Sequence, residues 1–96
     1  MTYIYKLEIN TWSKDEDEYY ASLEGLSAAA YQIFTDYLFR NEIPYEREAI
    51  LELVSPAAIK KSLEEEETIY NKHRITIQLI ASSGFNLHVT WLKLND

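Results

Sequence analysis

The sequence predicts a small α+β domain in two layers, in which two or three helices cover one face of an antiparallel sheet. Three observations support this fold class. The N-terminal region alternates apolar and polar residues, the middle of the chain has helical spacing, and the C-terminal region alternates on both sides of a Ser-Ser-Gly turn. We therefore expect the N-terminal strand and a C-terminal hairpin to form the sheet, with residues 1–96 as a single domain.

Composition limits the class of protein. The 96 residues, 47% apolar and 26% charged, suffice for one hydrophobic core. The absence of cysteine excludes disulfides, thiolate metal sites and cysteine nucleophiles, and two glycines are too few for a glycine-rich phosphate-binding loop. No signal-peptide pattern opens the sequence, so we expect a cytoplasmic location. The uncharged run over residues 75–92 is split by Ser-Ser-Gly, which favours a hairpin over a membrane span.

The first strand is expected over residues 3–12, where side chains alternate between two faces. For residues 14–24 two interpretations stay open. Ser13 and Glu16 fit the S-x-x-E capping box of a helix start, and the alternative is an acidic loop. Gly25 disfavours a continuous helix, so we expect a break between residues 24 and 27.

The clearest helix is expected from Ser27 to Arg40, with Asn41 as its end. Residues 45–54 fit a helical stripe, but a strand within residues 46–54 stays open because the run is short. Ser55 and Pro56 are typical of a helix start, since serine caps free amides and proline has no amide to lose.

The helix that begins at Pro56 is expected to end near Glu67, with Ile59, Leu63 and Tyr70 as its narrow inward stripe. The hairpin follows, with strands over residues 75–79 and 85–91. The expected order of elements is therefore β-α-α-α-β-β.

The net charge of −7 is distributed unevenly. Residues 15–67 carry 14 acidic and 4 basic residues, a net charge of −10. Two acidic runs dominate, the 15–18 run and the 64–67 run. Four further glutamates recur between them, mostly at four-residue steps that would place them on one side of a helix: Glu42, Glu46, Glu48 and Glu52. Each run can be a solvated helix end, but together they predict an acidic surface on the helical layer.

Such a surface suits a basic protein partner and disfavours direct binding to nucleic acid or to a membrane. The expected function is a non-enzymatic, acidic protein-binding domain that inhibits or regulates a nucleic-acid-binding protein, for example a nuclease. The expected interface residues are Asp15, Glu16, Asp17, Glu18, Glu64, Glu65, Glu66 and Glu67, with Tyr19 and Tyr20 as anchors. In size and charge the chain is similar to small acidic inhibitors, namely phage DNA mimics that act in anti-restriction or anti-CRISPR defence and immunity proteins of nuclease toxins.

We expect no cofactor and no metal. The loop around Asp15 and Asp17 lacks the glycine and the glutamate of a calcium-binding loop, and His73 and His88 are too few for a zinc site on their own. One alternative function is a self-associating assembly module, such as a homodimer, that uses a sheet edge or an outer sheet face. That face would hold Ile4, Trp12, Ile80, Leu92 and Leu94. The other alternative is a small hydrolase with His88 as general base.

Overall fold

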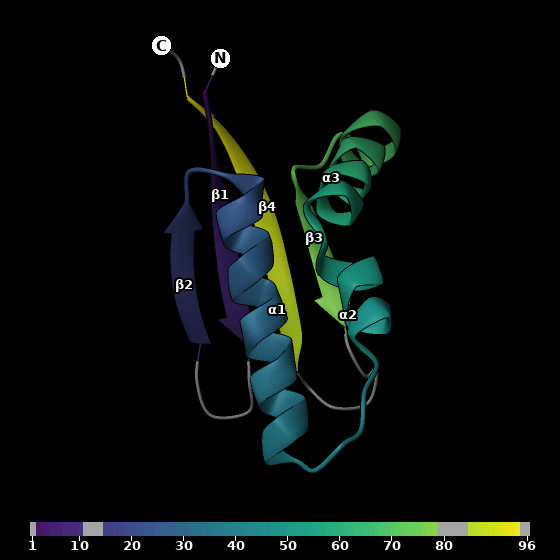
Figure 1. Cartoon of the computed structure of the whole chain (residues 1–96). Helices are drawn as coiled ribbons and strands as arrows, with labels where there is room; N and C mark the ends of the chain where they lie inside the picture. The colour runs from purple at the N-terminus through teal and green to yellow at the C-terminus, as the bar shows by residue number, and fades with distance from the viewer. Residues whose placement is uncertain (1, 11–14, 79–84, 95–96) are drawn as a thin grey trace.

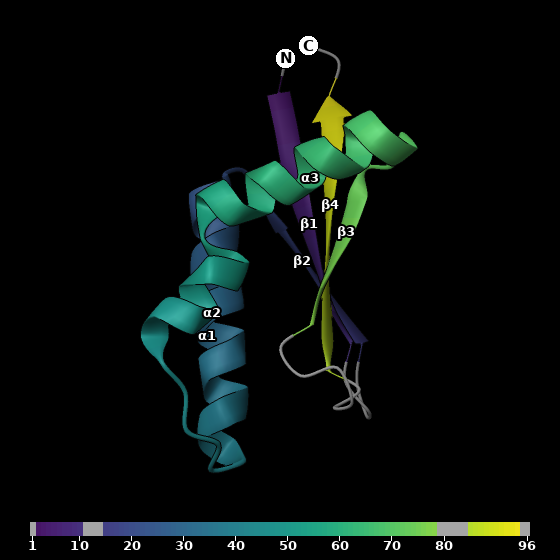
Figure 2. The same cartoon turned by 90° about the vertical axis from the view of Figure 1, so that its right-hand side faces the viewer.

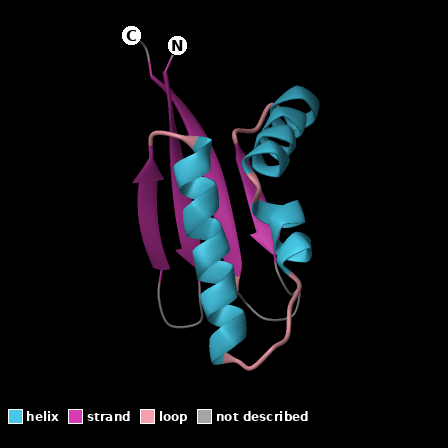
Figure 3. Cartoon of the chain, in the orientation of Figure 1, coloured by secondary structure: helices cyan, strands magenta, loops and turns pink. Residues whose placement is uncertain are grey.

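The computed structural model describes residues 2–10, 15–78 and 85–94, and every structural statement below concerns these ranges. They form a four-stranded sheet and three helices (Figure 1, Figure 3). The elements are β1 (Thr2–Asn10), β2 (Asp15–Tyr20), α1 (Leu23–Arg40), α2 (Arg47–Val54), α3 (Pro56–Tyr70), β3 (Arg74–Gln78) and β4 (Asn86–Leu94). The predicted α+β class, with an N-terminal strand and a C-terminal strand pair in one antiparallel sheet, is confirmed.

The strands lie in the order β2-β1-β4-β3, and each neighbouring pair is antiparallel. β1 and β4 are central, with Thr2 opposite Leu94 and Asn10 opposite Asn86. β2 and β3 are the edge strands. β3 and β4 correspond to the two strands of the predicted C-terminal hairpin, and their antiparallel pairing confirms that prediction. The predicted Ser-Ser-Gly turn lies outside the described residues.

Both interpretations of residues 14–24, helix and acidic loop, are wrong for residues 15–20, and Ser13 lies outside the described residues. Residues 15–20 form strand β2, which pairs with β1 so that Tyr20 faces Tyr5 and Asp17 faces Glu8. The element order is therefore β-β-α-α-α-β-β. An acidic strand is tolerated at the edge of a sheet because only one of its two edges is paired and the other is open to solvent. Charge on an edge strand also discourages pairing with other chains.

Helix α1 begins four residues earlier than predicted, at Leu23. The side chain of Ser22 caps it by accepting a hydrogen bond of 3.1 Å from the backbone N–H of Gly25. The break predicted near Gly25 does not occur, because this glycine lies in the first turn, where its amide bonds the cap. Asn41 ends the helix as predicted.

Residues 47–54 form helix α2, so the strand alternative is wrong. Buried Ile50 and Val54 are four residues apart and turn one side of α2 inward. Ser55 caps α3 by accepting a hydrogen bond of 3.2 Å from the N–H of Ala58, as the sequence predicts. The helix continues to Tyr70 and ends at Asn71, whose φ of 54° is left-handed.

The helices lie on one face of the sheet and the core lies between the two layers (Figure 2). α1 packs against β1 and β2, α3 packs against β3, and α2 packs on both of the other helices. The largest fully buried side chains come from strands and helices alike: Phe34, Leu7, Leu26, Ile59, Leu63, Leu87, Val54 and Val89. Predicted inward residues Ile59 and Leu63 are buried, whereas Tyr70 is exposed.

Candidate protein-binding surfaces

The 15–18 run lies on β2, at one edge of the sheet. Asp15, Glu16 and Asp17 are exposed, and Glu18 is half-buried. Side chains alternate along a strand, so Asp17 and Tyr19 share the open face of the sheet, the face away from the helices, while Glu18 and Tyr20 point to the helical side. The expectation that this run belongs to a helical surface is therefore wrong.

The two tyrosines of β2 have different environments. Tyr19 is 61% exposed and is available to a partner. Tyr20 is partly buried against the core and donates a hydrogen bond to Glu18. Burial and then the Glu18 carboxylate raise the pKa of the Tyr20 phenol to about 12. Tyr20 thus helps to attach β2 to the domain.

The 64–67 run lies on α3, where Glu64 and Glu65 are exposed and Glu66 and Glu67 are half-buried. Lys60 lies 3.9 Å from Glu64, and Lys93 of β4 lies 3.1 Å from Glu67. The Glu67 carboxylate raises the pKa of Lys93. This ion pair joins α3 to the sheet and gives Glu67 a structural role near the C-terminal end of its helix, where the helix dipole disfavours negative charge.

The structure does not bring the two runs together. β2 is one edge strand, whereas α3 packs against β3, the edge strand on the opposite side (Figure 1). The glutamates between the runs are also split. Glu42 has a left-handed φ of 55° in the turn after α1, and Glu46 precedes α2, so only Glu48 and Glu52 share a side of a helix. A single acidic helical face is not formed.

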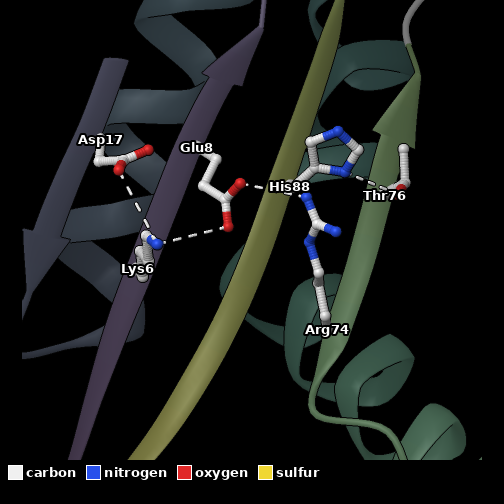
Figure 4. Close-up of polar contacts among 6 residues, drawn as sticks. All are labelled: Lys6, Glu8, Asp17, Arg74, Thr76 and His88. Carbon is white, nitrogen blue, oxygen red and sulfur yellow. Dashed lines mark hydrogen bonds and ion pairs between the residues drawn. The ribbon is translucent and has the colours of Figure 1, made fainter. Parts of the chain in front are cut away.

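The open face of the sheet carries a network of paired polar side chains (Figure 4). Lys6 lies 3.7 Å from Glu8 and 3.8 Å from Asp17, and Arg74 lies 3.1 Å from Glu8. The central charges of this face are therefore largely compensated within the domain. The contact between β3 and β1 could not be predicted from the sequence, because Arg74 and Glu8 are 66 residues apart in the chain.

His88, the candidate general base, lies on this open face with its Nδ1 2.8 Å from the hydroxyl of Thr76 (Figure 4). Burial and the nearby Arg74 lower the pKa of His88, and Glu8 acts in the opposite direction. Glu8 is itself bound by Arg74. The hydrolase alternative stays a prediction, which loss of activity in His88→Ala would test.

The described part of the apolar outer face expected for self-association lies at one end of the sheet. Ile4 pairs with Leu92 where β1 and β4 extend beyond the two edge strands. Leu92 and Leu94 are exposed there. Trp12 and Ile80 lie outside the described residues.

Two hollows were not indicated by the sequence. One, of about 580 Å³, lies between the edge of β3 and the two later helices and is lined by Glu52, Leu53, Ala58, Ser62, Ile75, Thr76, Ile77 and Gln78. The other, of about 690 Å³, lies at the turn between α1 and α2 and is lined by Leu38, Ile43, Pro44, Tyr45, Glu46, Ala49 and Ile50. The first depends on how α2 and α3 lie over β3, and the second on how α1 and α2 are connected, neither of which residue spacing specifies.

Neither a known protein family, nor a curated protein, nor a solved structure matches this chain. Among the described helices, none is long and apolar enough to cross a membrane. Within the described ranges, no three His, Asp or Glu side chains are grouped so that they could hold a metal ion.

Proposed function

We propose that this protein is a non-enzymatic binding domain that inhibits or regulates a basic, nucleic-acid-binding protein such as a nuclease. The observation that carries the proposal is the placement of the 15–18 run along an edge strand. Asp15, Glu16 and Asp17 are consecutive and exposed, and no further strand of the described chain pairs beyond them. A basic surface can approach this edge without rearrangement of the domain.

The spacing of charge on β2 supports a partner that binds nucleic acid. A strand rises about 3.3 Å per residue, so consecutive acidic residues give about one carboxylate per 3.3 Å. One strand of DNA carries a phosphate about every 3.4 Å along its axis. A protein groove that binds a row of phosphates would therefore meet a similar linear charge density on β2. The match is partial, because the carboxylates of β2 alternate between two faces and Lys6 lies near Asp17.

The 64–67 run is the weaker of the two candidate contacts. Lys60 and Lys93 lie within 4 Å of two of its four carboxylates, which reduces the field of this run. We therefore assign the main contact to β2 with Tyr19 as its exposed aromatic anchor, and a secondary, long-range electrostatic role to α3.

The proposal is tested with two variants that remove equal charge. One carries Asp15→Asn, Glu16→Gln, Asp17→Asn and Glu18→Gln. The other carries Glu64→Gln, Glu65→Gln, Glu66→Gln and Glu67→Gln. Wild type and both variants are used to capture partners from the host lysate at low and high salt. The expected partner is basic, is lost at high salt and is lost with the β2 variant more than with the α3 variant. A partner retained by both variants or at high salt contradicts the proposal.

Self-association is a second candidate, supported by exposed Leu92 and Leu94 beside Ile4 at the end of the sheet. Two copies could cover this apolar end around a two-fold axis. Light scattering over a range of protein concentrations tests this candidate. A dimer that Leu94→Glu converts to a monomer supports it, and a monomer at high concentration contradicts it.

A further inference from the structure

We propose that the groove beside β3 binds an extended segment of another protein, which pairs with β3 as a fifth strand. The groove is lined by four consecutive residues of β3, Ile75, Thr76, Ile77 and Gln78. Side chains of consecutive strand residues point to opposite faces, so a hollow that touches all four runs along the strand's edge. The proposal goes beyond the acidic contact of β2 and involves neither acidic run.

The backbone of β3 has hydrogen-bonding groups directed at this groove. The N–H of Trp91 donates a hydrogen bond of 3.1 Å to the carbonyl of His73, which marks the pair 73–91 as hydrogen-bonded. In an antiparallel ladder such pairs alternate, so Ile75 and Ile77 bond to β4. The N–H and C=O groups of Arg74, Thr76 and Gln78 therefore point to the free edge, where a fifth strand would meet them.

The two edge strands of the sheet differ in how well they suit pairing with an added strand. β2 carries four consecutive acidic residues, and such charge opposes the addition of a strand. Residues 75–78 of β3 are uncharged, and Arg74 at its start is held by Glu8. In the view of Figure 2, which looks onto β3, α3 crosses above the strand and the described helices leave the strand below it in view. Of the two edges, β3 is therefore the one whose described residues suit the addition of a strand.

The walls of the groove specify the chemistry of the added segment. Leu53, which is 39% exposed, and Ala58 provide apolar surface, and Glu52 provides the one charge among the lining residues. The inward side chains of an added strand would reach the helical wall, where apolar groups of moderate size fit about 580 Å³. A basic residue at one of these inward positions would pair with Glu52. The expected segment thus alternates outward polar residues with inward residues that are apolar or basic.

A second copy of this chain fits the groove less well. Ile75 and Ile77 of its β3 are already buried in its own core, so they cannot fill the groove of the first copy. Pairing of two β3 edges would also bring two domains of net charge −7 together. The occupant is therefore a segment of a different protein.

The probe is a capped peptide of about seven residues in which threonine alternates with two valines and one lysine, so that valine and lysine share the inward face. It is long enough to cover β3 at about 3.3 Å per residue. Binding to the full chain is followed by NMR through chemical shifts and amide hydrogen exchange. We expect slower exchange at Arg74, Thr76 and Gln78 on saturation. A peptide with alternate N-methyl amides, and one with glutamate in place of lysine, should each bind at least about tenfold more weakly.

Matched variants place the peptide in the groove. Ser62→Tyr fills the groove and should weaken binding at least about tenfold, whereas Thr68→Tyr, on exposed α3 surface outside the lining, should leave binding unchanged. If Ser62→Tyr fails to fold, the N-methylated peptide gives the same test on the wild-type chain.

Several results would overturn the proposal. These are the absence of binding at about 1 mM peptide, shifts that map away from β3, equal binding by the N-methylated peptide, or equal binding by the Ser62→Tyr and Thr68→Tyr variants. Protection of the same three amides on raising the protein concentration alone would identify a second copy as the occupant instead. None of these results bears on the acidic contact of β2, which the capture experiment tests separately.

Discussion

The hydroxyl of Ser27 in α1 donates a hydrogen bond of 2.6 Å to the backbone carbonyl of Val54, the last residue of α2. Both residues are buried. The carbonyls of a helix's last turn have no partner within the helix, so this contact satisfies a group that would otherwise be buried without one. It also fixes the end of α2 against α1, just before α3 begins at Pro56.

Ser27→Ala is therefore expected to lower the free energy of unfolding by about 1 to 3 kcal/mol, because it leaves the Val54 carbonyl buried and unpaired. Ser62→Ala removes an exposed hydroxyl from α3 and should change stability by less than about 0.5 kcal/mol. Chemical denaturation of both variants and wild type measures the difference. Equal stability of the two variants would show that the hydrogen bond contributes nothing.

A second stability prediction compares two phenylalanines of α1. Phe34 is fully buried and its ring lies 5.7 Å from that of Phe85, whereas Phe39 is 82% exposed. Phe34→Ala should lower the free energy of unfolding by about 3 to 5 kcal/mol through loss of buried surface and formation of a cavity. Phe39→Ala should have little effect. Similar decreases in the free energy of unfolding for the two variants would show that Phe34 is not part of the core.

His88 predicts a pH dependence of stability. Its pKa is lowered from 6.5 in the folded state, mainly by burial, so the unfolded chain binds the proton more tightly. The contribution of neutral His88 to the free energy of unfolding is thus fully present above pH 6.5. It is lost as the pH falls from 6.5 through the lowered pKa of the folded state. The Tm of His88→Gln should fall less than that of wild type over this range, with His73→Gln as the control for loss of an imidazole. Parallel curves for wild type and His88→Gln would refute the prediction.

Tyr20 predicts an effect of opposite sign at alkaline pH. Its pKa is raised from 10.0 to about 12, so the folded state favours the neutral phenol. Its contribution to stability is present below pH 10 and is lost as the pH rises from 10 to about 12. Tyr20→Phe should reduce this alkaline loss, as followed by circular dichroism. Tyr19→Phe controls for the removal of a tyrosine from the same strand, and an unchanged alkaline loss in Tyr20→Phe would count against the assignment.

Much of the fold could be predicted because local patterns and tertiary packing agree. Ser55 and Pro56 start α3 through backbone effects that act within one turn. β1, β3 and β4 alternate so regularly that their inward faces follow from the sequence. For residues 47–54 periodicity left two choices, and burial of Ile50 and Val54 against the other helices selects the helix.

β2 could not be predicted, because its four acidic residues have low strand propensity and the Ser13–Glu16 spacing is typical of a helix start. What makes residues 15–20 a strand is the partner β1, which offers an open edge and places Lys6 near Asp17. The same limit applies to the site. Glu67 and Lys93 are 26 residues apart, and the groove beside β3 exists only once α2 and α3 lie over the sheet.

The central claim is that the carboxylates of β2 drive association with a basic partner. The most direct measurement is the association rate constant of the captured partner with wild type and with the two neutralised variants, over a range of salt concentrations. We predict that the β2 variant associates about tenfold more slowly at low salt, that the α3 variant is slowed less, and that all three converge near 1 M salt, where charges are screened within about 3 Å. Equal association rates at low salt, or a wild-type rate that does not depend on salt, would contradict the claim.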